Sequence, residues 1–314
     1  MQEIINKTEL AIGFITYNHQ TAKYLPYFLD SLNKQSYSNF LIYVIDNSDE
    51  GNNINRDVIA SSGLNICYEK QSKNIGFARA YNLMMEKARE NGVDYFLVLN
   101  TDIIFSENVI EELMKAIKAD EKLSSVCPKL LEWDFENRKQ TNIIDSCGIV
   151  MTKALRFLDL GQSELDNGQY DDREILGASG AFSLFRMNAL RKIKDDHGYY
   201  DERMFMYKED CDLAYRLNKA GFKSRCVISQ LAYHDRSARS KGRRLINILK
   251  NRKSKNRQIK QWSLENQILI FKKHWSDQNF LQKTSILFHL MFLFVYIFFF
   301  EMYLLRIFLI ALKK

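Results

Sequence analysis

The first 120 residues alternate between short apolar runs and longer stretches in which apolar positions recur at helical spacing. The apolar runs, which are typical of buried strands, cover residues 10–18, 40–50, 64–69 and 94–105. Between them, residues 20–34 and 77–90 repeat apolar side chains every three or four positions, which predicts helices. Ser106 is predicted to cap a further helix. This order predicts a parallel sheet with helices on both faces.

Polar residues follow three of these predicted strands at the point where each strand ends. They are Thr16-Tyr17-Asn18, Asp46-Asn47 and Asn100-Thr101-Asp102. In parallel sheets of this kind, ligands bind beyond the carboxyl ends of the strands, so these side chains are predicted to line one site. No G-x-G-x-x-G motif follows the first strand, so the usual dinucleotide fingerprint is missing.

Asp102 and Asp46 each allow a chemical and a structural interpretation. A carboxylate at a strand end suits a hard divalent cation that also binds phosphate oxygens, which makes Asp102 a candidate metal ligand. Asp46 could accept hydrogen bonds from a base N–H or a ribose hydroxyl. Either residue could instead shape a turn or cap a helix. The spacing alone leaves both interpretations open.

Two further positions are candidates for phosphate and metal contacts. In residues 73–82, Asn74 and Gly76 precede a helix whose N-terminus would favour phosphate, and Arg79 lies in its first turn. An N-x-G before a helix is also an ordinary turn, so this signal is weak alone. His234 follows an apolar run and is a candidate metal ligand, although a lone histidine is more often structural.

Residues 204–222, "MFMYKEDCDLAYRLNKAGF", place Glu209, Asp210 and Asp212 within four positions. A helix dipole stabilises an acid in the first helical turn by about 0.3–1 kcal/mol, which accounts for one or two of them. It does not account for three, because like charges repel. A carboxyl group in a cleft beside other carboxylates has its pKa raised, which suits a general base.

The end of the chain is strongly apolar. From Ile286 to Phe300, fourteen of fifteen residues are apolar and only His289 is not. As one helix, residues 284–312 would extend about 43 Å at roughly 1.5 Å per residue, enough to span a bilayer with tilt. The region could also break at Glu301 into two interfacial pieces, or form a buried helix. Membrane contact is the favoured interpretation.

The positive charge of the chain is local. Residues 236–260 hold eleven Lys or Arg and no acid, so the rest of the chain carries about −4 of the net +7. Such a run attracts anionic headgroups, by about 1 kcal/mol per charge. It lacks interleaved aromatics and a nucleic-acid-binding signature, which disfavours a nucleic-acid partner. Residues 262–275 predict an amphipathic connecting helix. Five scattered cysteines and no signal peptide favour a cytoplasmic setting.

Taken in order, the motifs resemble those of bacterial family-two glycosyltransferases with a GT-A fold, and within them the rhamnosyltransferase-like enzymes of capsule, O-antigen and cell-wall polysaccharide synthesis. Over roughly residues 10–235 they are "ITYN", "VIDNSD", "NIGFARAYN", "LVLNTDI", "GASGAFSLFRMNAL", "GYYDERMFMYKEDCDLAYRLNKAGF" and "AYHDRSA". The resemblance implies an α/β fold with a Rossmann-like, mostly parallel sheet, flanking helices and a C-terminal helical membrane-associating extension. The implied units are residues 1–235 (catalytic domain), 236–283 (basic segment and amphipathic helix) and 284–314 (apolar segment).

The resemblance also implies which residues contact the donor and the metal. Nucleotide-sugar contacts would come from Thr16, Asn18, Asp46, Asn74, Gly76, Arg79, Asn100, Thr101 and Asp102. Asp102 and His234 would bind a divalent cation, Mg²⁺ or Mn²⁺. Asn100 departs from the D-x-D motif of the family at its first acid, which removes one charge from the metal site.

The remaining roles concern catalysis and the acceptor. Asp210 would be the catalytic base, supported by Glu209, while Asp212 and Gly180 would lie on the acceptor side. The implied enzyme inverts configuration as it moves a sugar from a UDP- or dTDP-type donor to a polyprenyl-diphosphate-linked saccharide, at the cytoplasmic face of the cell membrane. Whether it is a homo-oligomer stays open. The alternatives are a polyprenyl-phosphate sugar synthase and a non-catalytic, membrane-bound module that binds nucleotide sugar.

Overall fold

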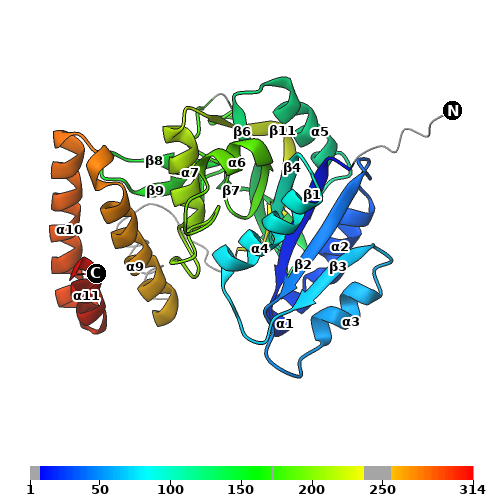
Figure 1. Ribbon diagram of the computed structural model, residues 1–314, viewed down its shortest axis with the longest axis horizontal. Coiled ribbons are helices and arrows are strands. Elements are labelled where there is room, and N and C mark those ends of the chain that lie inside the picture. The colour runs from blue at the N-terminus through cyan, green and yellow to red at the C-terminus, as the bar shows by residue number, and fades with distance from the viewer. Residues whose placement is uncertain (1–7, 172, 237–255, 314) are drawn as a thin grey trace.

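The computed structural model describes residues 8–171, 173–236 and 256–313 (Figure 1). At its centre lies a mixed sheet with the strand order β3-β2-β1-β4-β10-β6-β11-β5, and β7 pairs with β6 beside it. Helices cover both faces of this sheet, and three further helices stand at one end of the molecule. The predicted α/β fold with a C-terminal helical extension is therefore confirmed.

The first half of the sheet is parallel, as the alternation of strands and helices predicted. Its elements are β1 (Leu10–Thr16), α1 (Asn18–Ala22), α2 (Leu25–Asn33), β2 (Phe40–Asp46), α3 (Ile54–Ala60), β3 (Ile66–Lys70), α4 (Phe77–Glu90) and β4 (Tyr95–Leu99). The single helix predicted over residues 20–34 is two helices. Pro26 lies in the first turn of α2 and lacks the N–H that a continuous helix would need there.

The second half of the sheet mixes directions. Its elements are β5 (Ile103–Phe105), α5 (Val109–Ala119), β6 (Leu123–Asp134), β7 (Lys139–Ser146), β10 (Phe182–Arg186), α6 (Met187–Ile193), α7 (Glu209–Lys219) and β11 (Lys223–His234). The prediction of one strand over residues 94–105 is wrong, because β4 ends at Leu99 and β5 pairs antiparallel with β11 at the other end of the sheet. Ser106 does not cap α5, whose N-cap residue is Asn108. Strands β8 (Ile149–Met151) and β9 (Phe157–Asp159) form a separate pair.

Alternating side chains of β1 build the two cores that hold this sheet in place. Leu10, Ile12 and Phe14 have no exposed surface and belong to the core under α2 and α5, whereas Ala11 belongs to the core under α4. Each large apolar side chain buried in this way contributes roughly 1.5–3 kcal/mol. The rigid sheet fixes where the polar strand ends stand.

The C-terminal extension consists of α9 (Arg257–Lys273), α10 (Phe280–Phe300) and α11 (Leu305–Lys313). The apolar region is divided at Glu301 into two helices. This division was one of the predicted arrangements. Within the described ranges, α10 is the one helix long and apolar enough to cross a membrane. In its most apolar stretch of 18 residues, 11% of the residues are buried. Residues 237–255, which make up most of the predicted basic run, lie outside the described residues.

Candidate functional site

The ends of β1 and β2 are joined by the carboxylate of Asp46. Its Oδ1 accepts hydrogen bonds from the Thr16 hydroxyl at 2.9 Å and from the N–H and hydroxyl of Ser48 at 3.1 and 2.6 Å, and its Oδ2 accepts one from the Tyr68 hydroxyl. The side chain has no exposed surface. The Ser48 N–H contact is the Asx-turn that the sequence left open. Asp46 thus fixes two strand ends, and its predicted nucleoside contact, like that of Thr16, stays a prediction.

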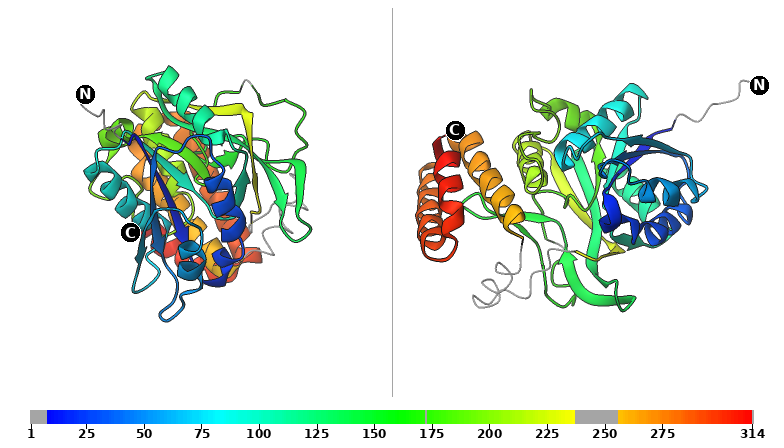
Figure 2. Two further views of the ribbon diagram at one scale, coloured as in Figure 1. Left: turned by 90° about the vertical axis from the view of Figure 1, so that its right-hand side faces the viewer. Right: turned by 90° about the horizontal axis from the view of Figure 1, so that it is seen from below.

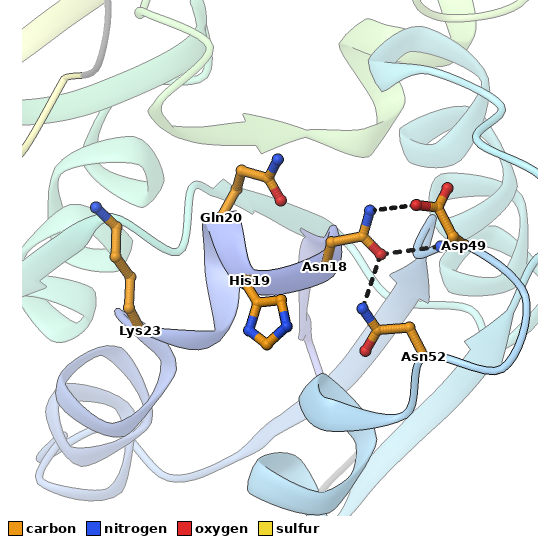
Figure 3. Close-up of a pocket in the computed structure, with 6 residues that line it drawn as sticks. All are labelled: Asn18, His19, Gln20, Lys23, Asp49 and Asn52. Carbon is orange, nitrogen blue, oxygen red and sulfur yellow. Dashed lines mark hydrogen bonds between the residues drawn. The ribbon is translucent and has the colours of Figure 1, made fainter.

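Asn18 lines an open pocket beyond these two strands. The pocket has a volume of about 530 Å³, and its lining residues are Asn18, His19, Gln20, Lys23, Asp49 and Asn52. Figure 3 shows Asn18 turned toward Asp49 and Asn52, on the side opposite Lys23. The Asn18 amide donates to Asp49 at 2.8 Å, and its Oδ1 accepts from the Asp49 N–H and the Asn52 amide at 3.0 Å each. A few placed polar groups around a cavity of this size suit a nucleoside.

Asn74 and Gly76 shape the turn that precedes α4. The Asn74 Oδ1 accepts the Gly76 N–H at 2.9 Å, and Gly76 has a φ of 81°. A Cβ at Gly76 would lie 2.4 Å from the carbonyl oxygen of Phe205, so glycine is required for this close approach of two chain segments. Arg79, in the first turn of α4, is exposed and has no hydrogen-bond or ion-pair partner among the described residues. Its guanidinium is therefore available to a phosphate.

Asp102, His234 and Asp145 form a row across the sheet. The His234 ring is almost fully buried, with Nε2 at 3.2 Å from Asp102 Oδ1 and Nδ1 at 2.8 Å from Asp145 Oδ2. Burial lowers the pKa of His234, but the carboxylates of Asp102 and Asp145 outweigh this effect and raise it to about 10. Two of these residues, Asp102 and His234, are the predicted metal ligands, and the fold brings them together.

Asp102 and His234 supply a carboxylate oxygen and an imidazole nitrogen, two donor types that a divalent cation takes, and the cation would displace the proton that the raised pKa of His234 keeps on its ring. A carboxylate oxygen and an imidazole nitrogen face each other, and Asp145 holds the other ring nitrogen, as carboxylates do behind metal-bound histidines. In the part of the chain that the structure describes, no group of three or more His, Cys, Asp or Glu side chains is arranged to hold a metal by itself. The remaining ligands would have to be water and substrate phosphate oxygens, which is usual for Mg²⁺.

Arg236 was not among the predicted site residues. Its guanidinium lies 2.7 Å from Asp159 Oδ2 and 3.2 Å from Asp145 Oδ1, and Asp210 also acts on it electrostatically. The only sequence signal for Arg236 is its place two residues after His234. Its acidic partners are distant in sequence, so the pairing is visible only in the fold.

The loop before β10 joins the end of β4 to the start of α7. The Asn100 N–H donates to the carbonyl oxygen of Ala181 at 2.8 Å, and the Gly180 N–H donates to Asp210 Oδ2 at 3.1 Å. A Cβ at Gly180 would lie 3.1 Å from Asp210, so this contact is tight. Thr101 is buried behind it. The loop therefore sets the distance between the strand-end polar residues and the proposed base.

Asp210 and Glu209 differ sharply in their surroundings. Asp210 is partly exposed and accepts two backbone N–H groups, from Gly180 and Cys211. Glu209 is buried, and its Oε2 has no hydrogen-bond partner among the described residues. Burial, and then the charge of Asp210, raises the pKa of Glu209 well above its ordinary value. A protonated Glu209 removes one of the three negative charges that the first turn of α7 would otherwise carry, and so reduces the repulsion among them.

Tyr207, two residues before α7, interacts electrostatically with both Glu209 and Asp102. Burial and Glu209 raise the pKa of Tyr207, Arg236 lowers it and Asp102 raises it. Tyr207 and Lys208 have φ values of 73° and 70°, in the left-handed region that non-glycine residues seldom adopt. Its phenol interacts with Glu209, Arg236 and Asp102, and Arg236 in turn interacts with Asp210. The predicted metal ligand and the proposed base therefore belong to one site.

Asp212 lies away from the open part of that site. Its carboxylate has no exposed surface and is bonded to Arg216 at 2.8 Å, Lys273 at 2.9 Å and His274 at 2.7 Å. Burial raises the pKa of Asp212, but these partners, His274 first, lower it to about 2. The geometry does not support the predicted acceptor-side role of Asp212. It assigns this carboxylate to fastening α7 to α9.

Helix α9 also holds the segment that leads into α7. The Asn266 amide donates to the carbonyl oxygens of Met206 at 2.9 Å and Tyr207 at 2.6 Å. The ring of Trp262 packs against Phe205, with 4.9 Å between the ring centroids. These contacts could not be predicted from the sequence, because they join residues about sixty positions apart. Helix α9 is therefore part of the frame of the site.

A family model described as Glycosyl transferase family 2 matches residues 12–194. No curated protein matches the sequence. Among solved structures, a mannosyltransferase from Pyrobaculum calidifontis, in complex with GDP-Man and Mn²⁺, is 13% identical with a TM-score of 0.56, over 97% of this chain and 74% of that one. S. aureus TarS 1-349 in complex with UDP is 15% identical with a TM-score of 0.52, over 94% of this chain and 73% of that one.

GalNAc-T7, solved with UDP, GalNAc and Mn²⁺, is a third similar structure. It is 13% identical to this chain with a TM-score of 0.59, and the match covers 85% of this chain. The chain spans about half of that protein, since the match covers 49% of it. At these identities the three structures establish a shared fold.

Proposed function

The chain belongs to glycosyl transferase family 2, and we propose that it is an inverting enzyme that moves a sugar from a nucleotide-diphosphate sugar to a hydroxyl group of a saccharide. The observation that carries this proposal is the placement of Asp210. Its carboxylate is partly exposed, is oriented by two backbone N–H groups and lies in one site with Asp102, His234 and Arg236.

Asp210 has the surroundings of a general base. Two backbone hydrogen bonds orient its carboxylate, and its partly exposed surface leaves it able to accept a proton from an acceptor hydroxyl. As that hydroxyl oxygen bonds to the anomeric carbon, its proton passes to Asp210 and the carbon–oxygen bond to the diphosphate breaks. The anomeric carbon gains oxocarbenium character in this step. A single displacement of this kind inverts the configuration.

The donor would lie along the opposite wall of the site. The pocket beside Asn18 suits the nucleoside. Arg79 is exposed and its side chain has no partner among the described residues, so it suits the diphosphate. Asp102 and His234 would hold Mg²⁺ or Mn²⁺, which when bound supplies positive charge against the leaving diphosphate. Similar structures were solved with UDP or GDP-Man. We propose a UDP- or dTDP-type donor here on the motif resemblance.

The acceptor and the location are further parts of the proposal. The exposed apolar surface of α10 and α11 and the basic run at residues 236–260 support work at the cytoplasmic face of the cell membrane. An acceptor saccharide carried on polyprenyl diphosphate would be found at that surface. The ordered motifs favour a rhamnosyl-type transfer in the synthesis of a capsule, O-antigen or cell-wall polysaccharide.

A donor panel tests this proposal. The full chain is incubated with UDP- and dTDP-sugars, membrane-extracted acceptor and Mg²⁺ or Mn²⁺, and nucleotide release and the anomeric configuration of the product are measured. We expect release with one donor class and an inverted linkage to a saccharide hydroxyl. A product on polyprenyl phosphate would instead identify a sugar-phosphate synthase. Donor binding without nucleotide release would identify a non-catalytic module.

A further inference from the structure

Helix α10 presents apolar side chains on two opposite faces. At about 100° per residue, Ile286, Leu293 and Ile297 share one face, and all three are buried. The opposite face carries Phe288, Phe292 and Phe299, which are 63%, 65% and 70% exposed. We call this second face, together with the exposed Leu309 and Ile310 of α11, the outer face. An apolar surface of this extent on a soluble monomer marks an interaction site.

The inner face of α10 is packed against α9 along most of its length. Ile286 joins a cluster with Ile270 and Phe271 of α9. Further along, Leu293 and Ile297 join another cluster with Leu264 and Ile268 of α9 and Phe308 of α11. Figures 1 and 2 show α10 and α11 as the outermost layer, with α9 between them and the sheet. The outer face therefore points away from the catalytic domain.

Helix α9 is in turn fixed to the rest of the protein by buried polar contacts at several points. Lys273 and His274 bond to Asp212, and Gln267 donates to the carbonyl oxygen of Leu155 at 3.0 Å. At the other end of α9, Lys260 pairs with Glu301 at 3.0 Å, with both side chains less than a tenth exposed. These groups are stable in protein surroundings and would be costly to transfer to lipid.

This arrangement is incompatible with α10 crossing a bilayer. Its 21 residues span about 31 Å at 1.5 Å per residue, which equals the hydrocarbon core of about 30 Å. To cross that core, α10 would have to leave α9, or draw α9 and its ionic contacts into the hydrocarbon. Lying flat, α10 keeps every contact and buries only its outer face.

We infer that α10 and α11 form a hairpin that lies in the plane of an anionic lipid bilayer, within one leaflet, and holds the catalytic domain at that surface. Charge favours lipid as the occupant, because residues 257–313 contain seven Lys or Arg and three Asp or Glu. Glu301 and Lys260 neutralise each other, which leaves the positive excess unchanged. The inference rests on the membrane location proposed above and specifies its geometry.

The test measures the depth of single fluorescent labels in phosphatidylglycerol and phosphatidylcholine vesicles. Cysteine replaces Phe288, Phe292 or Phe299 of the full chain carrying Cys67→Ser, since Cys67 is the exposed native cysteine. Each variant is labelled with bimane, and quenching by lipids brominated at different depths is recorded. Leu165→Cys is the control, because Leu165 is 62% exposed on the catalytic domain.

We expect the three α10 labels to be quenched to a similar extent, within about twofold of one another, and most strongly by lipid brominated near the headgroup. The control label should stay unquenched. Because residue 290 is the middle of α10, deep labels at positions 288 and 292 with a shallow label at 299 would establish a spanning helix and overturn the inference alone. If the protein binds vesicles but none of the three α10 labels is quenched, or if it self-associates through α10, the outer face contacts protein and not lipid, and the inference is wrong. Failure to bind vesicles would also remove the proposed membrane location, while sugar transfer is measured separately.

Discussion

Asp46 and Asp210 are both central to the proposed site, yet their surroundings are opposite. Asp46 has no exposed surface and accepts four hydrogen bonds from neighbouring side chains and backbone, so its capacity as an acceptor is filled by the protein. Asp210 is partly exposed, and among the described residues two backbone N–H groups hold it. Asp46 therefore organises the strand ends, whereas Asp210 keeps the acceptor capacity that the proposed base would need.

Asp102 combines features of both acids, because it is paired with His234 but still partly exposed. If it holds a metal, a chelator should lower the transfer rate by about two orders of magnitude or more, since the metal contributes several kcal/mol. The rate should return when Mg²⁺ or Mn²⁺ is added in excess. Full activity in chelator, with the unfolding temperature unchanged, would remove Asp102 and His234 as metal ligands.

Asp212 extends the comparison to a third kind of acid, one that is buried and fully paired. Asp212→Asn should lower the free energy of unfolding by about 3–5 kcal/mol, because Lys273 and Arg216 would lose a buried partner. Asp30→Asn is the control, since Asp30 and Lys34 form an exposed pair worth about 0–1 kcal/mol. Equal effects of the two substitutions in urea unfolding would contradict the assignment of Asp212 as the link between α7 and α9.

The same carboxylate predicts a pH dependence. The folded-state pKa of Asp212 is about 2, below the ordinary value of about 3.9. The stability that Asp212 contributes is therefore fully present above about pH 4 and is lost as the pH falls toward 2. The difference in unfolding free energy between wild type and Asp212→Asn, measured in urea, should shrink as the pH falls across this range. A constant difference between them would contradict the lowered pKa.

Asp46→Asn tests the structural side of the comparison. The amide cannot accept all the bonds that Thr16, Ser48 and Tyr68 donate, so we expect a loss of about 1–3 kcal/mol in the free energy of unfolding. The transfer rate of the folded variant should fall by less than about fivefold. Unchanged stability together with lost nucleotide binding would show instead that Asp46 serves the nucleoside directly.

Asn266→Ala tests the contacts by which α9 holds the segment before Asp210. Removing the two hydrogen bonds to Met206 and Tyr207 should loosen the segment before Asp210 and lower kcat about tenfold, at unchanged donor affinity. Gln267→Ala is the matched control. Gln267 lies in the same helix as Asn266, but it donates to the carbonyl oxygen of Leu155 instead of the segment before Asp210. A similar fall in kcat for both variants would show that Asn266 stabilises the protein in general and does not position the segment before Asp210.

Sequence patterns predicted the parts of this molecule that depend on local order. The four parallel strands, the bounds of α4 and the polar strand ends follow from hydrophobic periodicity, and Pro26 is a local reason for the one divided helix. The partners of His234 and Arg236 could not be predicted, because Asp145 and Asp159 reach them from distant strands. For the same reason, nothing local indicated that Asp212 faces α9 rather than the acceptor.

The account depends most on Asp210 as the base, and Asp210→Asn tests it directly. Transfer rate and nucleotide affinity are measured for this variant, with Asp30→Asn as a surface control. We predict a transfer rate lowered by about 10²–10⁴-fold, as expected for a lost general base, with a nucleotide dissociation constant within about twofold of the wild-type value. Substantial transfer by Asp210→Asn, with the nucleotide still bound, would contradict the account.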